Sequence, residues 1–219
     1  MNTVERLLSS TAEIWKEYNR HPFVLGIQGG TLDKEKFRYY MIQDYLYLED
    51  YAKTFAIGVA KAKSLKTANL FAKYINVMNG ELNVHKGYLA RLKVTQEEID
   101  YASRALDNLS YTSYMLRVAY EEGEAEIFAA ILACAYSYEF IAKEMVKRNP
   151  YAVNDEFYGD WVKEYTSDGY AAENAVLLET VNSLTQNYTE QQIQHLTDIF
   201  VTCSRYELGF WDMAWNKLL

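Results

Sequence analysis

The sequence has few residues that interrupt helices, with only 2 Pro and 10 Gly among 219 residues. Because these residues mark turns, their scarcity favours long helices over many short strands. No stretch shows the alternation of apolar and polar residues that is typical of half-buried strands, and no repeat, low-complexity segment or linker divides the chain. The sequence therefore predicts an all-α helical bundle, with residues 1–219 forming a single domain.

The chain also lacks a concentrated positive charge. Its net charge is −8, and its Lys and Arg residues are interspersed with Asp and Glu. Nucleic-acid binding requires a basic face that neutralises phosphates, so we expect no nucleic-acid partner. The amino terminus has no apolar leader segment, and no apolar run looks long enough to span a bilayer, so we expect no membrane partner either.

Cysteine is scarce as well. Cys134 and Cys203 are far apart, both lie in apolar helical patterns, and neither belongs to a CxxC or a metal-type motif. Two such thiols argue against a disulfide scaffold and predict a reducing, cytoplasmic location. Tyrosine, by contrast, is abundant, with 20 residues. Its ring buries apolar area while its hydroxyl stays available, which suits a core that is also the wall of a pocket.

Capping residues and helix breakers indicate where the helices begin and end. The pattern predicts helices over 3–19, ended by His21-Pro22, over about 33–64 with Asp33 as cap, and over about 66–93. Gly26–Gly30 reads as a loop. Further helices are expected after the caps Thr95, Ser110 and Thr189, between the acidic break 121–126 and Asn149-Pro150, around 158–165, and over about 169–182.

The predicted helix 33–64 carries a carboxylate on its apolar face. At helical spacing Asp44 shares this face with Phe37, Met41, Leu48, Tyr51 and Phe55. A buried, unpaired carboxylate costs several kcal/mol or changes its pKa, so something must compensate Asp44. Either another side chain of the fold satisfies it, or it binds a polar ligand inside the bundle; this helix alone leaves both open.

The same anomaly recurs on two other helices. Glu207 lies among Phe200, Cys203, Phe210 and Ala214, and Cys134 lies one turn before Tyr138 on a face with Ile127, Ala130, Ile141 and Met145. A lone cysteine is most often a small structural residue. Three helices that each carry one reactive group on the core face nevertheless indicate a cavity.

These groups together predict a chemistry. No histidine flanks Cys134 in sequence, so Glu207 is the best candidate for its base, provided that the two helices face each other. Burial would raise the carboxyl pKa of Glu207 toward values that serve proton transfer near neutral pH. Asp44 would accept paired N–H groups, and tyrosines would stack on a flat ring. We therefore expect a small, amino-bearing aromatic heterocycle that is attacked by a thiol.

Glu81 and His85 lie one turn apart on the predicted inner face of the helix 66–93. A carboxylate and an imidazole can share a metal ion. Di-iron bundles, however, use Glu-x-x-His with further carboxylates, whereas this spacing is Glu-x-x-x-His. A Glu81–His85 hydrogen bond is the favoured interpretation, and we expect no metal.

A set of short motifs occurs in order along essentially the whole chain: His21-Pro-Phe, Gly29-Gly-Thr-Leu32, Phe37…Tyr40, Gln43-Asp-Tyr45, Glu81…His85, Leu132-Ala-Cys134…Tyr138, Tyr158-x-x-Trp161…Tyr165 and Glu207…Phe210-Trp211. Together these motifs resemble the TenA/thiaminase II family of aminopyrimidine aminohydrolases. The resemblance implies a haem-oxygenase-like all-α fold, a homotetramer, no cofactor, and a role in thiamin salvage.

The resemblance also implies residue roles. Cys134 matches the nucleophile that adds to the pyrimidine ring, Glu207 the acid and base, and Asp44 the residue that holds the ring nitrogen and 4-amino group. The residues that match the pocket wall are Tyr47, Tyr111, Tyr138 and Tyr165. The substrate would be an aminopyrimidine or thiamin, and the product 4-amino-5-hydroxymethyl-2-methylpyrimidine.

Two residues beside the nucleophile depart from the family pattern. Tyr136 stands where a tryptophan or other large aromatic is frequent, and Ala133 stands where a proline is frequent. Both affect the expected shape of the pocket more than the type of reaction. The alternatives are a haem-oxygenase-fold oxidase, a metal-dependent bundle enzyme and a non-enzymatic regulator. The haem-oxygenase-fold oxidase is weakened because a haem site does not explain Asp44, Cys134 and Glu207 together.

Overall fold

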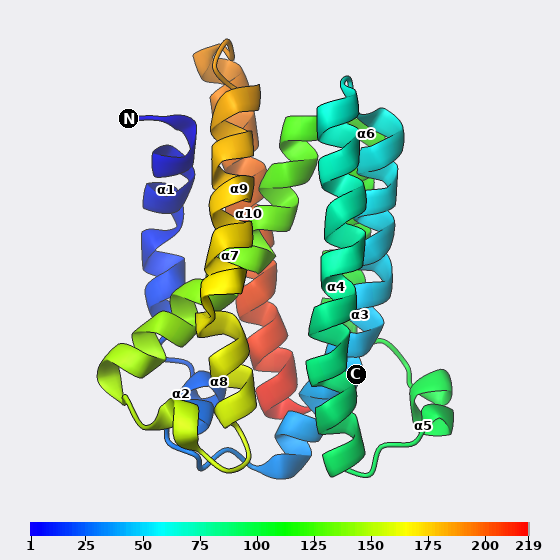
Figure 1. Cartoon of the computed structure of the whole chain (residues 1–219), viewed down its shortest axis with the longest axis vertical. Helices are drawn as coiled ribbons and strands as arrows, with labels where there is room; N and C mark the ends of the chain where they lie inside the picture. The colour runs from blue at the N-terminus through cyan, green and yellow to red at the C-terminus, as the bar shows by residue number, and fades with distance from the viewer. Residues whose placement is uncertain (219) are drawn as a thin grey trace.

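The computed structural model is a bundle of α-helices (Figure 1). It describes residues 1–218, without the side chains of 79–83. These residues contain no β-strand, so the all-α prediction is confirmed. The helices are α1 Thr3–Tyr18, α2 Pro22–Gln28, α3 Lys34–Lys61, α4 Leu65–Arg91, α5 Gln96–Tyr101, α6 Leu106–Glu121, α7 Glu124–Arg148, a short 3-10 turn η1 Ala152–Asn154, α8 Gly159–Thr166, α9 Asp168–Leu184 and α10 Glu190–Asn216.

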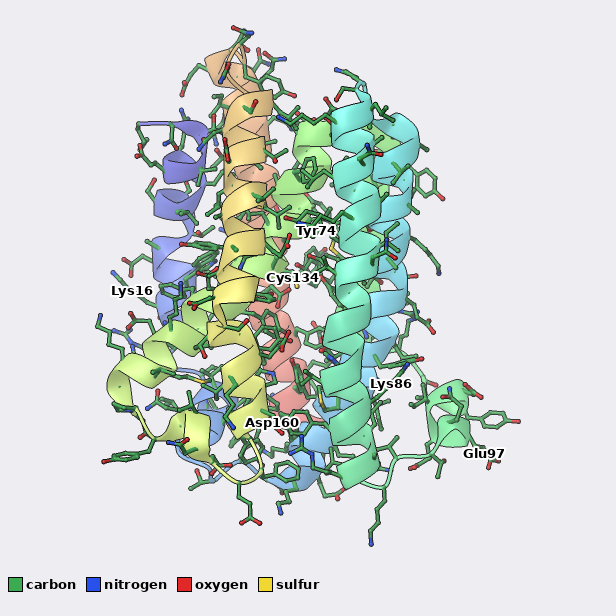
Figure 2. All side chains as sticks on the ribbon, viewed as in Figure 1. Lys16, Tyr74, Lys86, Glu97, Cys134 and Asp160 are labelled. Carbon is green, nitrogen blue, oxygen red and sulfur yellow. The ribbon has the colours of Figure 1, made fainter. Side chains whose placement is uncertain are left out.

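The helix α10 is the central helix of the bundle. It packs against α7, α1 and α6, and also contacts α3. On one side α3 pairs with α4 and α6, and on the other α9 packs along α7, whereas the short α5 stands outside the bundle (Figure 1). Figure 2 shows Cys134 and Tyr74 in the interior between α9 and α4, while Lys16 and Glu97 lie outside. The interior between α3, α4, α7 and α9 is therefore where a site can form.

Three predicted caps are confirmed. The Asp33 carboxylate accepts the Glu35 backbone N–H at 2.7 Å at the start of α3. Thr95 and Thr189 each form a capping box, with Glu98 and Gln192 respectively. In such a box two otherwise unpaired N–H groups are satisfied within four residues, so local sequence is enough to predict it.

The predicted loop over Gly26–Gly30 is wrong in its first half, because α2 runs through Gly26 to Gln28. His21 is the N-cap of α2, with its ring nitrogen accepting the Phe23 N–H, and Pro22 occupies the first helical position. A capped start with proline at this position favours a helix. The chain turns only at Gly30, whose φ of 66° suits glycine.

The predicted start of a helix at Ser110 is also wrong, because α6 begins at Leu106. The N-cap residue Ala105 has no side chain that can cap the helix. Its backbone N–H instead donates to Gln43 Oε1 of α3 at 3.0 Å, and the Asn108 amide donates to the Gln43 carbonyl at 2.7 Å. A partner 62 residues away in sequence replaces the local cap, and sequence alone cannot reveal it.

The helix α7 corrects one expectation about apolar runs. By length and composition it could cross a membrane, which we did not expect from the sequence. In the structure, however, 78% of its apolar window is buried inside the bundle. A core helix of a soluble protein shows this pattern.

Candidate active site

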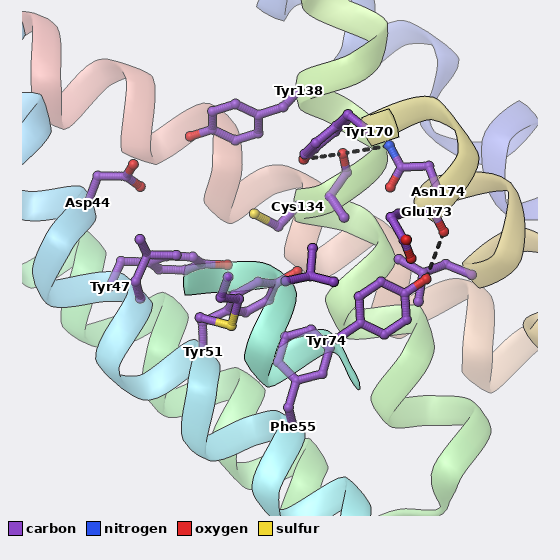
Figure 3. Close-up of a pocket in the computed structure, with 15 residues that line it drawn as sticks. Asp44, Tyr47, Tyr51, Phe55, Tyr74, Cys134, Tyr138, Tyr170, Glu173 and Asn174 are labelled. Atoms are coloured by element: carbon purple, nitrogen blue, oxygen red, sulfur yellow. Dashed lines mark hydrogen bonds between the residues drawn. The ribbon is translucent and has the colours of Figure 1, made fainter. Parts of the chain in front are cut away.

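A small cavity lies between α3, α4, α7 and α9 (Figure 3). Its volume is about 50 Å³. Four predicted site residues line it: Asp44 and Tyr47 from α3, and Cys134 and Tyr138 from α7. Figure 3 shows the Cys134 sulfur and the Asp44 carboxylate directed into the same space. The other lining residues are Leu48, Tyr51, Phe55, Tyr74, Val77, Met78, Ala135, Tyr170, Glu173, Asn174 and Leu177.

Glu207 of α10 does not line this cavity but lies beside Cys134. Its side chain is buried, with 2% exposed, and burial raises its pKa to about 8. The Cys134 thiol and the Tyr111 hydroxyl contact the carboxyl group and lower its pKa, whereas the charge of Asp44 raises it. The nucleophile candidate and its predicted base are thus neighbours. A carboxyl group with this pKa can both hold and release a proton near neutral pH.

Asp44 has a partner that the sequence did not reveal. His85 of α4 places its Nε2 atom in hydrogen-bonding contact with Asp44 Oδ2, and both side chains are buried. An ionised carboxylate only accepts hydrogen bonds, so the imidazole is the donor. The expected Glu81–His85 hydrogen bond cannot be assessed, since the Glu81 side chain lies outside the described residues. His85 therefore provides one hydrogen bond to the Asp44 carboxylate, and this carboxylate still faces the cavity (Figure 3).

Tyr111 of α6 stands behind Tyr47, with their ring centroids 5.3 Å apart. Its hydroxyl is buried and, among the residues that the structure describes, makes no hydrogen bond of standard geometry, although it is close enough to Glu207 to lower the pKa of that group. Burial raises the pKa of both tyrosines well above the usual value, so both hydroxyls stay neutral. Tyr111 thus belongs to the Glu207 side of the site rather than to the cavity wall.

Tyr165 of α8 does not line the cavity but lies behind residues that do. Its ring packs at 4.8 Å from that of Tyr138, which lines the cavity, and at 5.1 Å from that of Tyr170. The Tyr138 hydroxyl lies 3.3 Å from the Tyr40 hydroxyl. The structure thus brings all seven predicted residues into one region, with Tyr111, Tyr165 and Glu207 behind the four that line the cavity.

Sequence reasoning missed the contribution of α9. Tyr170, Glu173, Asn174 and Leu177 all line the cavity. Their spacing of three and four residues is that of one helix face, and this periodicity was the signal that could have identified them. Near the mouth, the Tyr74 hydroxyl of α4 donates to the Glu173 carbonyl at 2.7 Å (Figure 3).

The two departures beside Cys134 have different surroundings. Ala133 is fully buried in the core. The Tyr136 ring packs at 5.8 Å from Trp15 of α1 and is not among the side chains that line the cavity. In the part of the chain that the structure describes, no group of three or more His, Cys, Asp or Glu side chains could hold a metal ion.

Comparisons with known proteins place this geometry in a family. The sequence model of the TENA/THI-4/PQQC family matches residues 8–217. An aminopyrimidine aminohydrolase from Helicobacter pylori is 41% identical over 218 residues, which is 99% of this chain and 100% of that protein. The solved TenA homologue from P. horikoshii OT3 superposes with a TM-score of 0.87 at 30% identity and covers 99% of both chains.

A more distant comparison concerns the fold alone. A solved domain with a haem oxygenase-like fold from Shewanella denitrificans OS217 superposes with a TM-score of 0.70 at 15% identity and covers 97% of this chain and 92% of that one. The expected haem-oxygenase-like fold is thus confirmed. Since the family model spans nearly the whole sequence, the chain belongs to the TENA/THI-4/PQQC family.

Proposed function

We propose that the protein is an aminopyrimidine aminohydrolase (thiaminase II) of thiamin salvage. The observation that carries the proposal is the contact between Cys134 and Glu207 beside a cavity that Asp44 also faces. A thiol, a carboxyl group with a pKa of about 8, and a second carboxylate are the three groups that hydrolysis of an aminopyrimidine through a cysteine adduct requires. The name of the Helicobacter pylori relative gives the same activity.

In this proposal Cys134 is the nucleophile. Its thiol proton passes to Glu207, and the sulfur forms a bond to a carbon of the pyrimidine ring. Electrons displaced by this addition expel the group on the exocyclic methylene, and Glu207 gives the proton to the departing amine. Water then adds to the methylene and loses a proton to Glu207, and the C–S bond breaks to restore the thiol. In balance, the aminomethyl compound and water yield the hydroxymethyl compound and ammonia.

Asp44 has a binding role in this proposal. A carboxylate accepts an N–H of the 4-amino group of a pyrimidine, and a second N–H from the adjacent ring nitrogen when that nitrogen is protonated. Its contact with His85 orients it toward the cavity. The rings of Tyr47 and Tyr138 provide flat apolar surface on the cavity wall, while Tyr111 and Tyr165 support these rings from behind.

The experiment is a comparison of two substrates with purified protein. We expect turnover of 4-amino-5-aminomethyl-2-methylpyrimidine, and of thiamin, to 4-amino-5-hydroxymethyl-2-methylpyrimidine, detected by chromatography and mass spectrometry. The Cys134→Ala variant should form no product from either compound. Wild-type protein that binds neither compound and releases no hydroxymethylpyrimidine would exclude the proposal.

We also propose a cytoplasmic homotetramer. Cys134 and Cys203 are not joined in a disulfide, which fits a reducing compartment. Large apolar side chains are exposed on α5 and at the start of α6, with Tyr101 at 82% and Leu106 at 68% exposure. In the proposed tetramer these side chains would pack against another chain. Light scattering coupled to gel filtration should give four times the 25.4 kDa chain mass.

A further inference from the structure

The helix α7 bends near the candidate nucleophile. Figure 1 shows its second half turning away from the direction of the first, and Figure 2 places Cys134 near this bend. In an undisturbed helix each carbonyl accepts the N–H four residues later. Bends arise where side chains compete in this ladder. The region around Cys134 should therefore contain side-chain donors to the carbonyls of α7.

Three carbonyls around Cys134 do accept side-chain donors. Ile131 O accepts from the Tyr51 hydroxyl at 3.1 Å, and Cys134 O accepts from Ser137 Oγ at 2.9 Å. Ala135 O accepts two, from the hydroxyl of Tyr170 at 2.9 Å and from Nδ2 of Asn174 at 3.2 Å (Figure 3). Ala135 directly follows Cys134, so the position of its carbonyl is coupled to that of the cysteine.

Both donors to Ala135 come from one face of α9. Tyr170 and Asn174 are four residues apart, so their side chains lie on neighbouring turns of that helix. The start of α9 is itself fixed, because the Tyr170 N–H donates to the Ser167 side chain at 3.1 Å. The two donors therefore reach α7 from a well-anchored helix end.

The Asn174 amide has only one possible orientation. Its nitrogen donates to Ala135 O and also to Glu139 Oε2 at 2.6 Å, and the side chain is 2% exposed. Neither a carbonyl nor an ionised carboxylate can donate, so the amide nitrogen must face both. Glu139, 5% exposed, lies one turn after Ala135 on α7 and is also paired with Lys143. The carboxylate thereby fixes the amide that holds Ala135.

We propose that Tyr170 and Asn174 are positioning residues for Cys134. By holding the Ala135 carbonyl at the bend of α7, they direct the Cys134 sulfur toward Glu207 and into the cavity. The inference rests on the proposed function only in taking Cys134 as the nucleophile. Its physical basis is that a displacement of about 1 Å of a reacting group can lower a rate ~10²-fold.

The test uses Tyr170→Phe, Asn174→Ala and the double variant. The matched control is Tyr158→Phe, since Tyr158, like Tyr170, is a tyrosine whose hydroxyl donates to a backbone carbonyl, here Leu32 O at 2.5 Å, but Tyr158 does not line the cavity. Two rates are measured, kcat on the aminopyrimidine and the alkylation of Cys134 by iodoacetamide, followed by peptide mass spectrometry. Cys203, fully buried, reports any unfolding by becoming alkylated.

We expect the double variant to lose roughly ten- to a hundredfold in both kcat and Cys134 alkylation, because the sulfur moves away from Glu207. Product affinity should fall less than kcat, because Asp44, Tyr47 and Tyr138, the groups proposed to bind the ring, are unchanged, whereas Tyr170 and Asn174 only complete the cavity wall. The single variants should lose less, and their effects should not add, because both donate to one oxygen. Tyr158→Phe should change thermal stability alone.

Wild-type kcat and alkylation rates in the double variant, with a loss of stability like that of the control, would overturn the proposal. If the Asn174 variants do not fold, Tyr170→Phe alone is the test, because it removes only one hydroxyl. Unchanged kcat and Cys134 alkylation in Tyr170→Phe would then overturn the proposal. If the wild-type protein does not turn over the aminopyrimidine, the proposed function fails. The alkylation rates of Cys134 would still test the positioning role.

Discussion

The two buried carboxyl groups of the site, Asp44 and Glu207, differ in their partners. Asp44 contacts the imidazole of His85, a group that donates a hydrogen bond and can carry positive charge. Glu207 contacts the Tyr111 hydroxyl and the Cys134 thiol, neither of which is a cation, and burial raises its pKa to about 8. Asp44 is paired with a strongly polar hydrogen-bond donor. The pKa of Glu207 instead lies close to neutral pH, where the group can gain and lose a proton. In the proposed mechanism, environment rather than residue type is therefore what suits Asp44 to binding and Glu207 to proton transfer.

The largest expected effect on kcat comes from replacing Cys134 rather than either carboxylate. Cys134→Ala should lower kcat by at least ~10⁴-fold, because no covalent adduct can form. Calorimetry should show that the product pyrimidine still binds nearly as tightly as to the wild type. A variant that retains substantial turnover would mean that both carboxyl groups serve a direct attack by water.

Glu207→Gln should have the next largest effect on the rate, and the size of this effect should depend on the substrate. Glutamine keeps the shape but transfers no proton, so the rate on the aminomethylpyrimidine should fall by ~10²–10⁴-fold. Thiamin should suffer less, because its thiazolium is already a cationic leaving group. Equal and small losses in steady-state assays on both substrates would reduce Glu207 to a structural carboxyl group.

Asp44→Ala should act on binding. Losing a charge-assisted acceptor costs roughly 1.5–3 kcal/mol, which is about a 10- to 150-fold weaker affinity for the product pyrimidine by calorimetry. Asp44→Asn is the shape-keeping control and should lose a similar part of this affinity. If these variants lowered kcat and left product affinity intact, the roles of the two carboxylates would be reversed.

The last expected effect concerns stability. Because the folded protein raises the pKa of Glu207 from 4.5 to about 8, the folded state binds more protons than the unfolded chain between these values. Stability from this group is therefore complete below about pH 4.5 and is lost as pH rises toward 8. Thermal unfolding from pH 5 to 8 should show wild-type stability falling relative to Glu207→Gln. Parallel curves for the two proteins would contradict the raised pKa.

Local sequence predicted the parts of this molecule that depend on a single helix. The caps at Asp33, Thr95 and Thr189 involve neighbours within four residues, and helical spacing identified Asp44 as a polar residue on an apolar face. Each of these features follows from the geometry of one helix.

The sequence indicated that Cys134 and Glu207 meet across two helices, but other contacts between helices were not predicted. The contact of Asp44 with His85 spans 41 residues, and the Gln43 side chain that caps α6 comes from α3. The donors Tyr170 and Asn174 act on α7 from α9. Which faces meet is a property of tertiary packing, and neither spacing nor capping signals encode it.

The most direct test of the assignment of roles is the pH dependence of kcat/KM for the aminomethylpyrimidine, which reports the ionisations of the free enzyme. The rate of the wild type should change with pH around 8, the pKa of Glu207. Asp44→Asn should keep this ionisation limb at a somewhat lower pH, because the charge of Asp44 no longer raises the pKa of Glu207. Glu207→Gln should lack this limb, while limbs from other groups remain. A limb near pH 8 that persists in Glu207→Gln, or a complete loss of the limb in Asp44→Asn, would contradict the account.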